Sequence, residues 1–174
     1  MELRSTTRIP FPRRVVFAVY RDEMLKLVPY LPNIRRLEVR SREDAGTVVR
    51  IHNVWHGGGQ IPAAARAFLS DDMLSWNDHA VWKQDDFACE WRITTNSLTE
   101  AILCAGEHRF FEDGNETRIE LRGGLTIDAH KIKHVPRFLA GKVGRILEEF
   151  LADRIQPNFV SVADGVARYL RERP

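Results

Sequence analysis

His108 and Asp78 are the two ionisable side chains that fall among inward-facing apolar residues of predicted strands. A histidine beside a carboxylate can transfer protons as an acid–base pair. The strand registers expected from the hairpin turns separate the two by about six residues along one strand, or about 20 Å. The sequence therefore predicts two isolated groups. His108 should be a core histidine with a local hydrogen bond or a polar contact to a ligand, and Asp78 should lie near solvent at a mouth of the sheet.

The remaining histidines do not indicate a metal site. His52 and His56 share one outward strand face, and His130 and His134 are four residues apart just before the last predicted helix. Zinc sites need three or four ligands at suitable spacing, and neither pair has a further Cys, Asp or Glu in position. No metal is expected.

Cys89 and Cys104 fall on diagonal inward positions of neighbouring strands, with α-carbons roughly 7–8 Å apart. That separation is marginal for a disulfide, so two buried thiols are expected. The sequence contains no G-x-S-x-G, P-loop or G-x-G-x-x-G motif. Gly57-Gly58-Gly59 is not followed by Lys-Ser/Thr, so it is a loop and not a phosphate cradle. No cofactor is expected.

Composition and length are those of an ordinary globular domain. The 174 residues are 44% hydrophobic and 29% charged, with a net charge of +2, and this length favours one domain over residues 1–174. Arginines alternate with acidic residues, which argues against nucleic acid as a partner. No apolar run approaches the ~20 residues of a membrane span. The N-terminus lacks the apolar core of a signal peptide, so a cytoplasmic location is expected. No oligomeric state is predicted.

Alternation of apolar and polar residues predicts seven strands. The first covers residues 2–9, two short helices follow within residues 15–28, and the second strand covers residues 34–42. Asp44-Ala45-Gly46 predicts a three-residue hairpin loop with Gly46 in the left-handed region. Turns at Asp85-Asp86, residues 96–99 and Asp113-Gly114 join the last four strands. They give one consistent inner face, which a one-residue slip would reverse.

The last part of the chain, residues 136–171, predicts a long helix. Apolar residues recur at helical spacing in two sets that are rotated from each other by a third of a turn or more: Leu139, Val143, Ile146, Leu147, Phe150 and Leu151, then Ile155, Phe159, Val162, Val166, Tyr169 and Leu170. An interior proline breaks or kinks a helix. We therefore expect a bend or a break near Gln156-Pro157.

The connection from Gly57 to Asp72 is longer than a hairpin needs. It begins with three glycines and continues through an alanine-rich stretch. Loops of this length in compact domains often act as lids. We expect this segment to cover one end of a cavity.

The order of strand, two short helices, six strands and long helix resembles the START-related helix-grip superfamily, the SRPBCC proteins. Three stretches carry the likeness: Thr6-Thr7-Arg8-Ile9-Pro10-Phe11-Pro12 before Val15-Val16-Phe17, Leu31-Pro32-Asn33-Ile34, and Gly123-Gly124-Leu125-Thr126-Ile127. The resemblance implies an α+β fold in which a curved antiparallel sheet of about seven strands wraps the long helix. It also implies a cavity for an apolar ligand between sheet and helix.

The inner face is rich in large aromatic residues, and Gly106, Gly123, Gly141 and Gly144 are each expected to leave room beside them. The predicted ligand-contacting residues are Asn53, Trp55, Trp76, Trp82, Trp91, Gly106, His108, Phe110, Thr117, Ile119, Leu121, Leu139 and Val143.

Two functions remain open. One is a binding or carrier protein for an apolar or amphipathic small molecule such as a lipid, a quinone or a polyketide. The alternative is an aromatase/cyclase-like enzyme that acts on a polyketide in the same cavity. For that alternative His108 is the candidate catalytic residue, with Asn53 and Thr117 as orienting groups.

Overall fold

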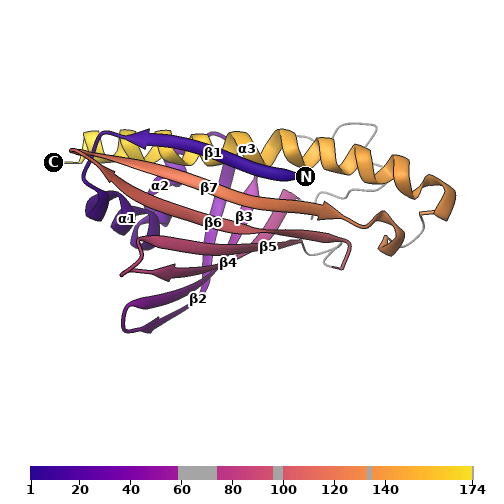
Figure 1. The fold of residues 1–174 in the computed structure, drawn as a ribbon, viewed down its shortest axis with the longest axis horizontal. Helices are drawn as coiled ribbons and strands as arrows, with labels where there is room; N and C mark the ends of the chain where they lie inside the picture. Colours follow the sequence, from indigo (N-terminus) through magenta and orange to yellow (C-terminus); the bar gives the residue numbers. More distant parts are fainter. Residues whose placement is uncertain (59–73, 96–99, 133–134, 174) are drawn as a thin grey trace.

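The computed structural model describes residues 1–58, 74–95, 100–132 and 135–173, and Figure 1 shows their arrangement. The predicted lid lies outside the described residues apart from Gly57 and Gly58, and so do His134 and the turn at residues 96–99. The elements in chain order are β1 (Glu2–Ile9), α1 (Arg13–Asp22), α2 (Met24–Leu27), η1 (Val28–Tyr30), β2 (Ile34–Ala45), β3 (Val48–Gly57), β4 (Ser75–Lys83), β5 (Ala88–Thr95), β6 (Ile102–Asp113), β7 (Glu116–Ile127), η3 (Ala129–Lys131), η4 (Arg137–Leu139) and α3 (Ala140–Glu172).

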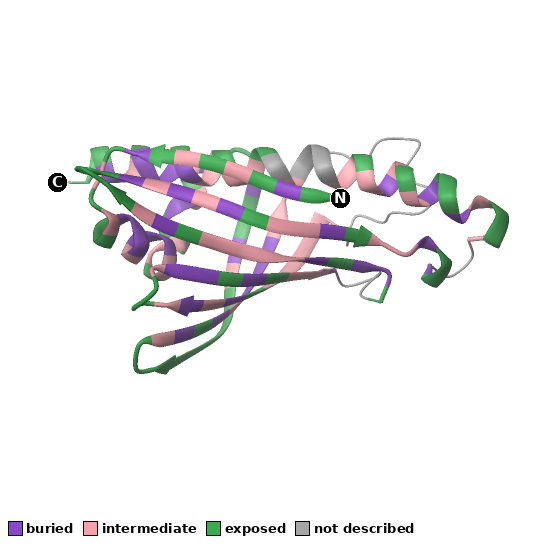
Figure 2. Ribbon diagram, in the orientation of Figure 1, coloured by how far each residue is buried: buried purple, intermediate pink, exposed green. Residues whose placement is uncertain are grey.

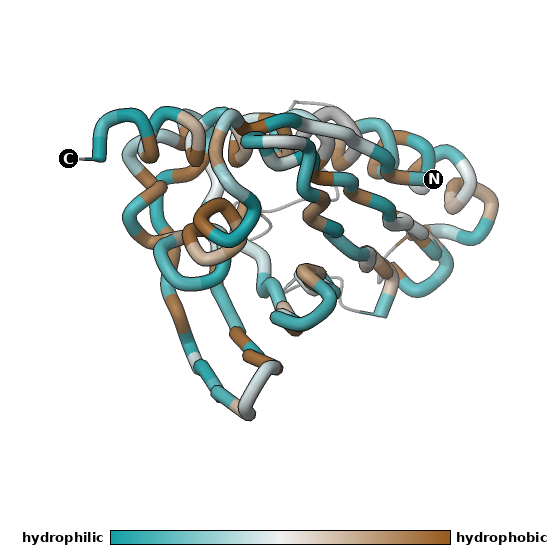
Figure 3. The backbone as a smooth tube through the Cα atoms, turned by 60° about the vertical axis from the view of Figure 1, so that its left-hand side comes forward, coloured by the Kyte–Doolittle hydropathy of each residue, from teal (hydrophilic) through white to brown (hydrophobic). Residues whose placement is uncertain are grey.

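The strands form one antiparallel sheet in the order β1-β7-β6-β5-β4-β3-β2. Helix α3 lies along the sheet beside β1 and β7, while β2 to β5 turn away from it (Figure 1). Buried and exposed residues alternate along the strands (Figure 2), as do hydrophobic and hydrophilic ones (Figure 3). This is the helix-grip architecture that the order of elements predicted.

The predicted inner faces are confirmed, but two registers differ from the prediction by two residues. His108 pairs with Cys89 and Leu121, not with Phe87 and Ile119. For β6 and β7 the cause is at the turn, because their loop is Gly114-Asn115 and Gly114 has φ 63°. The turn between β5 and β6 lies outside the described residues. A slip of two residues keeps every side chain on its own face.

The first hairpin also has a shorter loop than expected. Ala45 pairs with Val48, so the loop is the two residues Gly46-Thr47. Gly46 has φ 65°, as predicted for the left-handed region.

Helix α3 is continuous from Ala140 to Glu172 and contains Pro157, so the predicted break at this residue is wrong. Pro157 is exposed and its ring displaces no core side chain. On either side, the buried residues Leu147 and Val166 anchor the helix to the sheet. Packing of both halves outweighs the ~3 kcal/mol that an interior proline costs.

The rotation of the apolar stripe has another cause than a break. The first half of α3 packs through Val143 and Leu147 against a cluster that includes Leu3 and Leu125. The second half packs through Val166 against a separate cluster around Ile9, beneath α1. Because the sheet twists along the helix, the buried face of the helix must rotate as well.

Trp91 packs against the backbone of two paired glycines, which have no side chains to keep the indole away. Gly106 and Gly123 are directly opposite each other on β6 and β7. A Cβ atom added at Gly106 would lie 2.5 Å from Trp91 Cζ2, and one added at Gly123 would lie 3.0 Å from the same ring. The room expected beside these glycines is therefore filled by the indole. No such crowding occurs on the helix, since a Cβ at Gly141 would meet nothing within 4 Å and one at Gly144 only Ala129 at 3.7 Å.

We expect Gly106→Ala to lower the free energy of unfolding by about 1–3 kcal/mol, the usual cost of overpacking a core. Urea denaturation measures it. The matched control is Gly124→Ala on β7, where the new Cβ would have only Met1 O as a neighbour, at 3.9 Å. Equal stability of the two variants would contradict the packing of Trp91 on the glycine pair.

Candidate functional site

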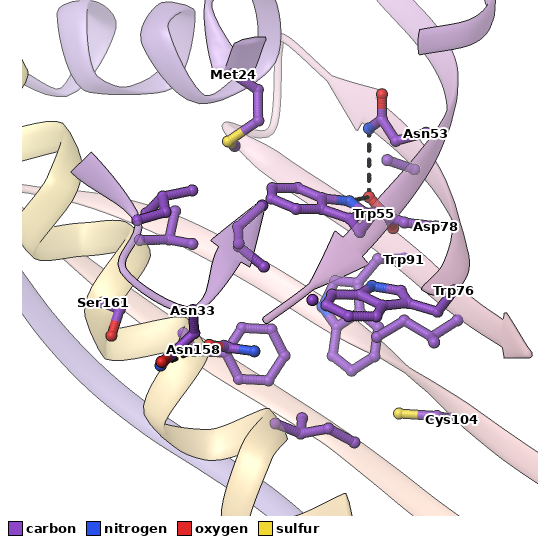
Figure 4. A pocket seen from close by; sticks show the side chains of 18 of the residues that line it. Met24, Asn33, Asn53, Trp55, Trp76, Asp78, Trp91, Cys104, Asn158 and Ser161 are labelled. Atoms are coloured by element: carbon purple, nitrogen blue, oxygen red, sulfur yellow. Dashed lines mark hydrogen bonds between the residues drawn. The ribbon is translucent and has the colours of Figure 1, made fainter. Parts of the chain in front are cut away.

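A cavity of about 1110 Å³ lies between the sheet and α3. Its wall is formed by residues of β2 to β6, by Leu125 of β7, by the middle of α3 and by residues in and near α1, α2 and η1. Figure 4 shows the indoles of Trp55, Trp76 and Trp91 around this space, with Asn158 and Ser161 reaching it from α3. The rings of Trp55 and Trp76 are nearly parallel, at 4°, with centroids 6.2 Å apart. The site is a wide, mainly apolar chamber with several large aromatic side chains.

Six of the thirteen residues predicted to contact a ligand line this cavity: Asn53, Trp55, Trp76, Trp82, Trp91 and His108. The other seven lie outside its wall: Gly106, Phe110, Thr117, Ile119, Leu121, Leu139 and Val143. Gly106 is covered by Trp91. Thr117 is fully buried and donates a hydrogen bond to the carbonyl oxygen of Phe11 at 2.7 Å.

Close packing excludes most of the seven from the cavity. Helix α3 packs over β1 and β7, so Ile119 and Leu121 of β7 belong to the core, while Leu125 of the same strand reaches the cavity. Ile119 and Leu121 are each 3% exposed, and Val143 is 2% exposed. Phe110 is packed edge-on against Phe17. The cavity lies mainly where the sheet curves away from the helix, toward β2, β3, β4 and β5, and it also reaches Ile102, Cys104 and His108 of β6.

Asp78 faces the cavity and does not lie at a solvent-exposed mouth, which corrects the sequence-based prediction. Trp55 Nε1 donates to Asp78 Oδ2 at 3.3 Å, and Asn53 Nδ2 donates to the same oxygen at 3.4 Å; Figure 4 draws both groups. Burial raises the pKa of the carboxyl above its usual value, and the two hydrogen bonds oppose this rise without cancelling it. Asp78 is a carboxyl group held within an apolar chamber.

His108 lies on the opposite side of Trp91 and is not a partner of Asp78. Its ring centroid is 6.0 Å from that of Trp91 and 5.4 Å from that of Phe159. No hydrogen bond to its ring nitrogens occurs within the described part of the chain. Burial lowers the pKa of His108 to about 4, so the ring is neutral at pH 7.

The separation of the two groups is smaller than predicted. Asp78 is level with Ile93, and Ile93 with Cys104, four residues from His108. That is about 13 Å along the strand, still too far for a hydrogen bond. The two groups therefore offer polar contacts at separate points of the cavity wall.

Polar residues of the second half of α3 were missed by the sequence interpretation. Asn158 and Ser161 line the cavity, and Asn33 Nδ2 donates to Asn158 Oδ1 at 3.4 Å. A signal was present, because Asn158 and Ser161 directly precede Phe159 and Val162 in the apolar stripe. Their inward orientation depends on the phase of the helix after Pro157, which the expected break obscured.

The histidines outside the cavity have structural partners. His52 Nε2 donates to Asn77 Oδ1 at 2.9 Å. His56 Nε2 donates to Glu38 at 2.9 Å and its Nδ1 accepts from Ser75 Oγ. Among the described residues, no group of three or more potential ligands could hold a metal ion. Cys89 and Cys104 are buried free thiols, as predicted.

No protein-family model matches the chain, and no curated protein sequence is significantly similar to it. Solved structures do match over nearly the whole length. TTHA0849 from Thermus thermophilus has a TM-score of 0.67 at 17% identity, covering 97% of this chain and 99% of that one. The ZhuI aromatase/cyclase from Streptomyces sp. R1128 has a TM-score of 0.64 at 17% identity, covering 99% and 94%. Truncated norcoclaurine synthase from Thalictrum flavum has a TM-score of 0.66 at 10% identity, covering 100% and 95%.

These likenesses establish the helix-grip fold. None of the helices in the described part of the chain has the length and hydrophobicity needed to cross a bilayer.

His108 should impose a pH dependence on stability. Its folded pKa of about 4 lies below the ordinary histidine value of 6.5, so the unfolded chain binds more protons in between. The free energy of unfolding should therefore fall as pH drops from about 6.5 to about 4, by up to ~1.4 kcal/mol per pH unit. We expect His108→Gln to flatten this slope in urea denaturation at stepped pH. An unchanged slope would show that the ring is not held neutral by burial.

Proposed function

We propose that this protein binds an apolar or amphipathic small molecule, such as a lipid, a quinone or a polyketide-like compound, between its sheet and α3. The observation that carries the proposal is the 1110 Å³ chamber walled by Trp55, Trp76, Trp82 and Trp91. This volume is slightly above the usual range for small-molecule sites, about 300–1,000 Å³. An aromatic wall of this size favours a ligand with a large hydrophobic body.

The polar groups of the wall favour a ligand that also carries hydrogen-bonding atoms. Asp78 presents a second carboxyl oxygen, Oδ1, for which no hydrogen bond occurs among the described residues. His108 has unpartnered ring nitrogens in the same described set. Buried polar groups gain from a partner, so a ligand with a hydroxyl or amine near Asp78 satisfies this site better than a pure hydrocarbon.

The solved structures are compatible with this proposal. Two of them are named as an aromatase/cyclase and as norcoclaurine synthase, enzymes that by their names act on small organic molecules. This supports a small-molecule role for the same fold here, and it does not identify the compound.

Filling the cavity should abolish binding. We expect Ser161→Phe, which projects a ring into the chamber from α3, to weaken uptake of Nile red more than about tenfold, because the ring occupies space that the probe needs. Fluorescence titration measures this. The matched control is Val160→Phe on the same helix, since Val160 is 45% exposed and does not line the cavity. Equal loss in both variants, or none in either, would count against the proposed site. Mass spectrometry of small molecules extracted from the purified protein would then identify the natural ligand.

A second candidate is an enzyme of the aromatase/cyclase kind, and Asp78 is the observation that favours it. A carboxyl whose pKa is raised by burial holds its proton more readily than a free aspartic acid, so it can serve as a proton donor as well as an acceptor. In this alternative Asp78 moves the proton, Asn53 and Trp55 hold its carboxyl in place, and His108 orients the substrate by a hydrogen bond.

Asp78→Asn and His108→Phe distinguish binding from catalysis once the ligand is known. If the protein only binds, each variant should lose about tenfold in affinity and at most ~150-fold, the effect of one hydrogen bond. If it is an enzyme, Asp78→Asn should keep affinity within that range while turnover falls by about a hundredfold or more. Unchanged turnover in Asp78→Asn would reject the catalytic role of this residue. Calorimetry and product analysis provide the two measurements.

A further inference from the structure

The N-terminal end of α3 carries an unusual surface. Phe138 is 85% exposed, the most exposed large hydrophobic residue in the described part of the chain. Together with Arg137, Lys142 and Arg145 it forms what we call the basic tip. Figure 1 shows that this end of α3 reaches beyond the ends of the strands, and Figure 2 shows it largely exposed.

The residues of the basic tip lie at the start of α3. Phe138 lies in η4 directly before α3, and Lys142 and Arg145 lie three residues apart on one face of the first turns of α3. Gly141 lies between Phe138 and Lys142, and a Cβ there would meet nothing within 4 Å. The face is therefore open, with an aromatic ring at its end and two cations behind it.

The cations of the basic tip lack carboxylate partners. No ion pair to Arg137, Lys142 or Arg145 is formed among the described residues, whereas Arg4, Arg8, Arg42, Arg109, Arg118 and Arg122 on the strands are all paired. The sequence itself has no Asp or Glu from residue 129 to residue 146. The positive charge at this end is thus free to act on a partner.

We propose that the basic tip docks on a membrane surface that contains anionic lipids, with Phe138 inserted among the lipids. Exposed aromatic side chains flanked by Lys and Arg are suited to the membrane interface, where the ring meets the acyl boundary and the cations meet lipid phosphates. The tip is convex and none of its four residues lines a cavity. A convex tip fits a deformable bilayer better than a rigid protein surface, which would need a matching pocket.

The basic tip lies at the start of the helix that forms part of the cavity wall, so membrane docking would bring the cavity close to the lipid. Ile146 and Phe150, one to two turns further along α3, line the cavity. A bilayer in contact with the tip would therefore lie near the part of the cavity wall that Ile146 and Phe150 form. The docking surface itself does not depend on a ligand in the cavity.

Vesicle flotation of the purified protein tests the proposal. It should float with vesicles of phosphatidylcholine and phosphatidylglycerol in equal parts and not with pure phosphatidylcholine, and high salt should release it. Phe138→Ser should weaken binding about tenfold or more, because one buried Phe is removed. Lys142→Gln should weaken it about fivefold and reduce the salt dependence. Both residues are exposed, so both variants should fold normally by circular dichroism.

Val160→Ser and Arg171→Gln serve as matched controls, since both are exposed residues of α3 away from the tip, and neither should change flotation. Ser161→Phe should also float normally, which separates this proposal from ligand binding in the cavity. Absence of flotation, equal flotation with neutral vesicles, or wild-type flotation of Phe138→Ser would overturn the proposal. So would a dimer in light scattering that Phe138→Ser dissociates, or tighter binding to a single-stranded oligonucleotide than to anionic vesicles.

Discussion

Trp91 contacts the sheet on one side and α3 on the other. This contact marks the boundary between the close-packed core and the cavity. The indole can lie flat because Gly106 and Gly123 have no side chains beneath it. Phe159 of α3 then rests against the indole, with ring centroids 5.5 Å apart. On the β7 side of this stack the helix and sheet are close-packed. On the β4 side the sheet curves away from α3, and the space between sheet and helix is the cavity.

Burial shifts the pKa values of Asp78 and His108 in the cavity wall in opposite directions, and both shifts favour the uncharged form. The pKa of Asp78 is raised and the pKa of His108 is lowered, because a medium of low polarity disfavours the charged form of each. Both shifts move the cavity toward electrical neutrality. The four tryptophans of the wall suit an apolar guest, and the hydrogen bonds from Asn53 and Trp55 keep the Asp78 carboxyl oriented.

The fold was predictable from the sequence because strands and helices show repeating patterns of apolar residues over only a few positions. Alternation sorts side chains between two faces, and an error of two residues in register, as at His108, leaves that sorting intact. The cavity wall was less predictable, because inward orientation does not say whether a neighbour fills the space. Ile119 and Trp76 both point inward. Ile119 packs in the hydrophobic core, whereas Trp76 lines the cavity. That difference depends on sheet curvature, which local sequence does not encode. Asp78 was misplaced for the same reason.

The net charge of the chain says less about its partners than the positions of the charged residues do. A net charge of +2 predicts little about partners. On the outer face of the sheet, Glu120 pairs with both Arg118 and Arg122, and Glu107 pairs with Arg109. Such exposed neighbours cancel each other's field within about 10 Å at ordinary ionic strength. Arg137, Lys142 and Arg145 form no ion pair among the described residues, so a local positive field remains at the start of α3. That helix also walls the cavity, which brings the charged end and the apolar chamber onto one rigid element.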